Sequence, residues 1–169
     1  MRVRLFDVAK DQTGAALVEF AIVLPVLMAL ILGLAQFGMI FYNYILVTNA
    51  AATGARQLSI SRWDSTPYTD TVSAIENAAG SLALSACVGA TPSCITLSVN
   101  GTACASDSSC STATNGLQNA PLPSSNTTTP WPSSVTVQYP CTNNSIMPTS
   151  LISLTGICPL RSTMQQLVQ

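Results

Sequence analysis

The chain has 169 residues, of which 8% are charged, and its formal net charge is -1. The usual charged fraction is about 25%, and a nucleic-acid-binding surface would be basic, so we expect no nucleic-acid partner. The sequence contains no histidine, which excludes Ser-His-Asp and Cys-His catalytic arrangements and every zinc site that uses imidazole. We therefore expect none of these catalytic or zinc sites, and no metal or cofactor.

Residues 1–14 are short and polar, with three basic and two acidic side chains. Basic residues accumulate on the cytoplasmic side of a membrane segment, whereas acidic residues contribute little to orientation. The next basic residue is Arg56. This asymmetry places the N-terminus in the cytoplasm and everything beyond about Tyr44 outside it.

The central feature is an apolar run from Phe20 to Tyr44, and no charged residue occurs from Phe20 to Ala55. A membrane-spanning helix needs about 20 such residues. The run exceeds the 7–15 residues of a typical secretory signal core, so its length favours an anchor. Ala50-Ala51-Ala52 nevertheless offers a small-residue cleavage site, and a cleaved, secreted form stays open as the alternative.

Glu19 lies at the entrance of the apolar run. A carboxylate at this depth is expensive to desolvate, which makes it a functional candidate by default. The competing interpretation is a membrane-border acid that is stabilised by the positive N-terminal end of the helix.

The helical pattern extends beyond the membrane, and residues 15–58 are predicted to form one helix after a break at Gly14. Such a helix is about 65 Å long, whereas the hydrocarbon core is about 30 Å thick. Pro25 lies inside the run, where a membrane helix tolerates it with a kink. The excess length favours a helix that packs against copies or partners.

Small residues mark two stretches of this helix as contact surfaces. Ala29 and Gly33 are four residues apart, a spacing that lets another helix approach closely, although glycine and alanine are also common in membrane helices without a partner. Ala51, Gly54 and Ala55 belong to a second small-residue stretch, which we expect to pack against a partner helix.

Residues 59–169 are predicted to form an extracytoplasmic α+β domain with a small antiparallel sheet. A break at residues 63–67 precedes a short helix with apolar residues at helical spacing. Residues 100–132, rich in Ser, Thr, Asn, Gly and Pro, are interpreted as loop, and the tryptophans are expected to cover a small core. The predicted elements are a helix at 70–79 ending at Gly80, strands at 94–99, 134–139 and 160–164, a turn at Asn100-Gly101, a connection at 140–148 and a weaker candidate element at 151–154.

All six cysteines lie beyond residue 80, and no two form a C-x-x-C pair. An even number on one side of a membrane segment indicates disulfides in an oxidising compartment. Six cysteines allow 15 connectivities. We predict the local pairs Cys87–Cys94, Cys104–Cys110 and Cys141–Cys158.

The N-terminal motifs resemble those of the TadE-like family, pilin-like proteins of the bacterial Tad (tight adherence, Flp pilus) machinery. The resemblance covers roughly residues 14–58. Its motifs are Gly14-Ala-Ala-Leu-Val-Glu-Phe20, Leu24-Pro25, Phe37-Gly38, Asn49-Ala-Ala51 and Gly54-Ala-Arg56, with a looser similarity at residues 160–164.

The resemblance implies that a prepilin peptidase cuts after Gly14, so that Ala15 becomes the new N-terminus and Glu19 the fifth residue of the mature chain. Because Gly14 has no side chain, an extended backbone there fits a narrow protease cleft. The new ammonium could pair with Glu19 of a neighbouring subunit. The sequence differs from the wider type IV pilins, whose mature chains usually begin with Phe or Met followed by Thr-Leu.

The resemblance thus implies a minor pilin or pseudopilin in pilus assembly, adhesion and secretion, with no enzymatic activity of its own. The chain is expected to consist of a leader (1–14), a long helix (15–58) and a domain (59–169). The expected partners are the peptidase, other Tad pilins or minor pilins, the inner-membrane assembly platform and membrane lipid. The expected location is the inner membrane, with the C-terminal domain in the periplasm or, within a pilus, outside the cell. The alternative is a single-pass anchored periplasmic or adhesive domain that does not enter a filament.

Overall fold

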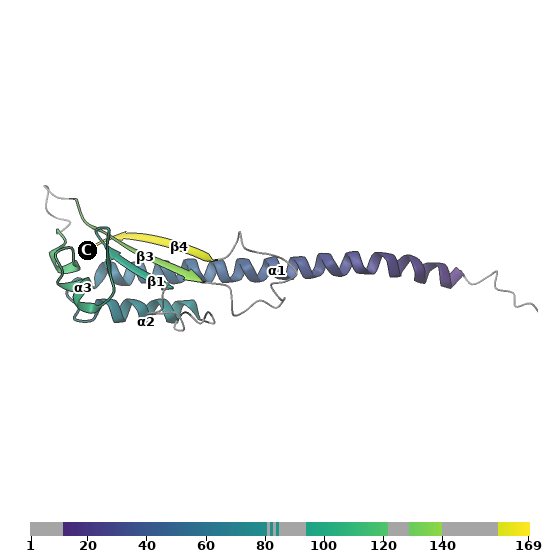
Figure 1. Ribbon diagram of the computed structural model, residues 1–169, viewed down its shortest axis with the longest axis horizontal. Helices are drawn as coiled ribbons and strands as arrows, with labels where there is room; N and C mark the ends of the chain where they lie inside the picture. Colours follow the sequence, from purple (N-terminus) through teal and green to yellow (C-terminus); the bar gives the residue numbers. More distant parts are fainter. Residues whose placement is uncertain (1–11, 81, 83, 85–93, 122–128, 140–158) are drawn as a thin grey trace, which may run out of the picture. The chain divides into compact units, whose positions relative to one another are not determined.

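The computed structural model describes residues 12–80, 82, 84, 94–121, 129–139 and 159–169 (Figure 1). The chain divides into two compact units, Met1–Ile40 and Phe41–Gln169. The helix α1, Gln12–Ile60, contributes to both units. We refer to Phe41–Gln169 as the head unit and describe each unit by itself.

The described part of the first unit, residues 12–40, is helical throughout. Its large apolar side chains, from Leu17 to Met39, are exposed. The stretch Ala16–Ile60 is long and apolar enough to cross a membrane, so α1 is a candidate membrane anchor. The expected break at Gly14 is wrong, because α1 already begins at Gln12. One glycine costs a helix only about 1 kcal/mol, which does not by itself end it.

In its described residues, the head unit contains the α-helices α2 and α3, the 3-10 helix η2 and a four-stranded antiparallel sheet, so the predicted α+β class is confirmed. The sheet order is β2-β1-β3-β4. The elements are α2 (Pro67–Ala79), β1 (Ile95–Val99), β2 (Thr102–Cys104), α3 (Asp107–Ser111), η2 (Leu117–Asn119), β3 (Pro132–Tyr139) and β4 (Leu160–Leu167).

One face of the sheet is apolar and buried. Side chains alternate between the two faces of a strand, and the strands β1 and β3 follow this rule with every second residue buried. The register pairs Leu97 with Val135 and Ile95 with Val137, so that buried residues of neighbouring strands lie side by side. In Figure 1, the strands and α2 both lie along the C-terminal segment of α1, and the core of the head unit forms among these three elements.

The predicted second helix begins earlier than expected. Pro67, interpreted as a helix breaker, is the first residue of α2, a position that suits proline because no amide N–H is needed there. The predicted stop is confirmed, since Gly80 adopts a φ of 58° directly after the helix. The predicted strands correspond to β1, β3 and β4, and β4 continues to Leu167.

The interpretation of residues 100–132 as loop is wrong for three segments, because β2, α3 and η2 form there. Asn100 and Gly101 both have positive φ, 50° and 78°, as a tight two-residue hairpin turn requires. The predicted turn therefore closes a β1–β2 hairpin. The candidate element at 151–154, the connection at 140–148 and the residues Cys87, Cys141 and Cys158 lie outside the described residues.

Candidate processing site and assembly surfaces

Gly14, Ala15 and Glu19 all lie near the start of α1. A side chain added at Gly14 would meet no atom within 4 Å. Glu19 is exposed and makes no ion pair with another described residue. Gly14 and Glu19 are therefore open on the surface of α1, without contact to a second element among the described residues.

The first small-residue pair is also open. Ala29 is exposed, and a Cβ built on Gly33 would meet nothing within 4 Å. Glycine at such a position allows the backbone of another helix to approach closely. The expected role of Ala29 and Gly33 in helix packing remains a prediction.

The second small-residue stretch packs inside the head unit. Ala51 and Ala55 have no exposed surface, and Gly54 is buried. A Cβ on Gly54 would collide with the side chain of Ile75 on α2 and lie 3.2 Å from Val135 on β3. The expectation of a partner helix here is therefore corrected, because α2 and the sheet of the same chain occupy this face of α1.

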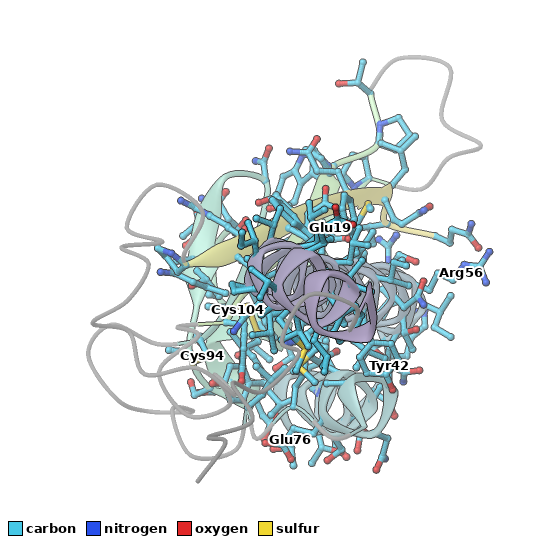
Figure 2. The ribbon with its side chains drawn as sticks, turned by 90° about the vertical axis from the view of Figure 1, so that its right-hand side faces the viewer. Glu19, Tyr42, Arg56, Glu76, Cys94 and Cys104 are labelled. Atoms are coloured by element: carbon cyan, nitrogen blue, oxygen red, sulfur yellow. A yellow bond between two sulfur atoms is a disulfide. The ribbon has the colours of Figure 1, made fainter. Side chains whose placement is uncertain are left out.

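The opposite face of the same helical segment is exposed. In the end-on view of Figure 2, Tyr42 and Arg56 lie on the other side of α1 from Cys94 and Cys104.

Trp63, just beyond the helix, is 77% exposed, so the expectation that it covers the core is wrong. Its ring lies 5.5 Å from the guanidinium carbon of Arg62, a cation–π distance.

Arg62 is a residue whose role the sequence did not indicate. Its side chain is buried, and its Nη2 donates to the carbonyl oxygen of Ala120 and, at 3.5 Å, to that of Gln118. These carbonyls lie at the C-terminal end of η2, where a positive charge is favourable. Arg62 thus connects the end of α1 to a segment 56–58 residues further along the chain.

Asp107 is a second residue that the sequence analysis missed. Its Oδ1 accepts a hydrogen bond from the backbone N–H of Thr69 at 2.9 Å, and its Oδ2 accepts one from the Thr69 hydroxyl at 2.7 Å. The N-cap residue of α2, Thr66, makes no side-chain capping bond. Asp107 therefore caps α2 from another element.

These bonds also affect the titration of Asp107. The hydrogen bond from the Thr69 backbone is the largest effect and lowers the pKa of this carboxyl below its ordinary value. Burial opposes it, and the weaker effects of the Thr69 side chain and the Tyr68 backbone lower the pKa further. The ionised form is therefore the one that caps α2.

The predicted Cys104–Cys110 disulfide is confirmed, with an S–S distance of 2.06 Å. It connects β2 to α3. Cys94 is also disulfide-bonded. The predicted pairs Cys87–Cys94 and Cys141–Cys158 involve residues outside the described part of the chain.

A family model described as "TadE-like protein" matches residues 14–56. This segment is TadE-like. The match confirms the resemblance found in the sequence and extends over α1 from Gly14 to Arg56, but it ends before α2 and the sheet. No curated protein and no solved structure matches the chain.

The TadE-like segment indicates a protein associated with the Tad pilus. TadE-like pilus proteins are structural rather than catalytic. The same segment contains the candidate membrane anchor, and it has an exposed part and a part that is buried in the head unit. The large apolar side chains of this segment from Leu17 to Met39 are exposed, whereas its last turns form part of the head-unit core.

Proposed function

We propose that the protein is a minor pilin or pseudopilin of a Tad-type (Flp) pilus. The observation that carries the proposal is the TadE-like match over residues 14–56. It unites a small residue at the cleavage position, a carboxylate five residues later and a long apolar helix in one segment. In this role α1 holds the protein in the inner membrane and afterwards joins a pilus or an assembly complex, while the rest of the chain faces the periplasm.

The first step of the proposed function is cleavage after Gly14 by a prepilin peptidase. The peptidase is a separate enzyme, and this chain is its substrate. Removal of residues 1–14 eliminates their basic side chains and creates a new ammonium at Ala15. The protease must bind the backbone around Gly14 in an extended form, so the start of α1 has to unwind there. A glycine, which costs the helix about 1 kcal/mol, makes this unwinding easier.

The second step is assembly through Glu19. The ammonium at Ala15 of one subunit would pair with the Glu19 carboxylate of its neighbour. At about 4 Å and an effective dielectric constant of 20, their attraction is about 4 kcal/mol before desolvation is subtracted. Such a pair contributes to the register between helices more reliably than to net stability. The exposed pair Ala29 and Gly33 would allow the same helices to approach closely.

The experiment that tests processing is N-terminal sequencing of the membrane-extracted protein, with the intact mass as a second readout. We expect a mature chain that begins at Ala15, and a Gly14→Leu variant that stays uncut. The matched control is Gly38→Leu in the same helix, which should be cut normally. A chain that begins at Met1 would support an anchored domain outside any filament, and a chain that begins near Thr53 would support a secreted form.

Partners follow from the same proposal. The protein would contact the peptidase, the inner-membrane assembly platform and other Tad pilins or minor pilins, and roles in adhesion and secretion would result from its place in the pilus. Ala51, Gly54 and Ala55 are buried within the head unit. The proposed contacts with other pilins therefore use the part of α1 that precedes Phe41.

A further inference from the structure

Two Asn-Gly pairs, Asn100-Gly101 and Asn115-Gly116, lie close together in the head unit. The side-chain amide of Asn115 donates to the hydroxyl of Thr102, the residue directly after the first pair, at 2.9 Å. An asparagine followed by glycine loses its side-chain amide more readily than other asparagines, because glycine has no side chain to hinder attack by its own backbone nitrogen. The two pairs therefore offer the same chemistry in different surroundings.

The first pair lies open at the tip of the β1–β2 hairpin. Asn100 and Gly101 are both exposed, and a Cβ built on Gly101 would meet nothing within 4 Å. Among the described residues, neither the side-chain amide of Asn100 nor the N–H of Gly101 makes a hydrogen bond. The backbone N–H of Asn100 donates to the carbonyl of Pro132 at 2.8 Å. The hairpin is thus attached to β3, while the two groups that would react are unrestrained.

The second pair is restrained at both reacting groups. Asn115 is half-buried and Gly116 is buried. The amide of Asn115 is engaged by Thr102, and the N–H of Gly116 donates to the carbonyl of Ala113 at 2.6 Å. A Cβ on Gly116 would collide with the backbone of Ser111, which shows how closely this segment is packed. Attack by the Gly116 nitrogen would have to break both hydrogen bonds and displace packed backbone.

We propose that Asn100 is a deamidation site of the head unit, whereas the fold protects Asn115. The backbone nitrogen of Gly101 gives up its proton to a base in the solvent and attacks Cγ of Asn100. A C–N bond forms, the side-chain nitrogen takes up a proton and leaves as ammonia, and a cyclic imide remains. Water then opens the imide at either of its carbonyl carbons, which gives aspartate or isoaspartate. The reaction needs only water and is independent of the proposed pilus function.

Deamidation changes both the charge and the backbone of the turn. Either product adds a negative charge to a chain whose formal net charge is -1. Isoaspartate also routes the backbone through Cβ, so an extra carbon enters a two-residue turn that needs positive φ at both positions, as Asn100 and Gly101 have. The pairing of Val99 with Thr102 next to the turn then loses its geometry. We expect the β1–β2 hairpin to loosen first.

The first test is peptide mapping by mass spectrometry after incubation of the full-length protein in detergent at mildly alkaline pH. A sample in guanidinium chloride supplies the rates of the unfolded chain, in which both pairs should react alike. In the folded protein we expect conversion at Asn100 to exceed that at Asn115 by about tenfold or more, because two hydrogen bonds restrain only the second pair. Equal conversion in the folded protein, or an intact Asn100 once the unfolded chain has largely reacted, would overturn the proposal.

The second test compares wild type with Asn100→Gly by hydrogen exchange before and after the same incubation. Gly-Gly also suits a two-residue hairpin turn, and this variant has no side-chain amide to lose at the turn. We expect residues 99–104 to exchange faster in the incubated wild type and to stay unchanged in the incubated variant. Equal loosening of both proteins, or no change in a wild type that contains isoaspartate, would contradict the proposed effect on the turn. If Asn100→Gly fails to fold, peptide mapping of wild type alone decides.

Discussion

At the scale of single residues, Gly54 determines how closely α1 approaches the rest of the head unit. Ile75 of α2 and Val135 of β3 occupy the space where a side chain would begin, and Ile75 has no exposed surface. Close packing at this point therefore depends on the missing Cβ atom, and the flanking alanines extend the narrow contact along α1.

We predict that Gly54→Ala lowers the thermal unfolding temperature of the head unit. Overpacking a well-packed core costs about 1–3 kcal/mol, whereas the gain in helix propensity is at most about 1 kcal/mol. The neighbouring substitution Thr53→Ala, at an exposed position, should leave the unfolding temperature unchanged or raise it slightly. Equal unfolding temperatures for Gly54→Ala and wild type would contradict this prediction and show that the side chains of Ile75 and Val135 can move aside without cost.

Asp107 leads to a prediction about pH. Because its folded-state pKa is lowered, its capping contribution is complete above the unfolded-state pKa of about 3.9 and is lost as the pH falls through the folded-state pKa. Asp107→Ala should therefore destabilise the head unit at neutral pH by about 0.5–2 kcal/mol, as the loss of a helix cap does. The difference from wild type should shrink in acid.

The check is chemical denaturation of wild type, Asp107→Ala and the control Asp64→Ala at neutral and acidic pH. Asp64 is exposed and its side chain caps no helix among the described elements, so its removal should have little effect. A difference between wild type and Asp107→Ala that stays constant down to the lowest pH would contradict the proposed cap.

At the scale of elements, α3 is too short to be stable alone, because isolated helices below about 12 residues are marginal in water. Two local features and one long-range contact stabilise it. Ser106 and Ser109 form a reciprocal capping box, the Cys104–Cys110 disulfide connects the helix to β2, and Asp107 binds Thr69 on α2. The segment therefore derives its structure from caps and cross-links rather than from an apolar face.

We predict that the double variant Cys104→Ala, Cys110→Ala loses about 2 kcal/mol of unfolding free energy, the entropic effect of a bridge that closes so short a loop. Protease digestion should then cut first within residues 104–116, and the cut should be absent from the wild-type protein. Unchanged protection of this segment would mean that the capping box and Asp107 suffice.

At the scale of the whole molecule, the chain combines a TadE-like helical segment with a head unit of 129 residues, Phe41–Gln169. The proposed ion pair joins the Glu19 carboxylate of one subunit to the Ala15 ammonium of its neighbour, and this ammonium exists only after cleavage. We therefore predict that Glu19→Ala leaves cleavage at Gly14 intact but reduces entry into pilus complexes. Glu19→Asp, which keeps the charge on a shorter side chain, should retain part of the assembly. Normal assembly of Glu19→Ala would instead favour a membrane-border acid.

The size of the head unit leads to a prediction about stoichiometry. The major pilins of the Tad class, as the resemblance implies, are little more than the N-terminal helix, and a body of about 130 residues has a radius of gyration near 14 Å. Such a body on every subunit would not fit the close spacing of bare helices. Quantitative mass spectrometry of purified pili should find a few copies per filament. A ratio to the major pilin near one would overturn the minor-component assignment.

The sequence alone determined the features that depend on neighbouring residues. The long apolar run predicted α1, period-two alternation predicted β1 and β3, and Asn100-Gly101 predicted a turn, whereas β4 was only a weaker candidate. The TadE-like motifs were also recognisable, because they lie close together in one segment. Short elements in polar surroundings, such as α3, were missed because their stability comes from caps and a disulfide, which leave no hydrophobic period.

The tertiary structure decided which surfaces are covered. The small residues from Ala51 to Ala55 have the composition of a helix–helix contact whether the neighbour is a partner or the same chain, and only the fold shows that α2 and β3 are that neighbour. Likewise, nothing near Arg62 or Asp107 in the sequence indicates Ala120 or Thr69, which lie 58 and 38 residues away. Local pattern specifies the elements, whereas long-range packing decides which faces they bury.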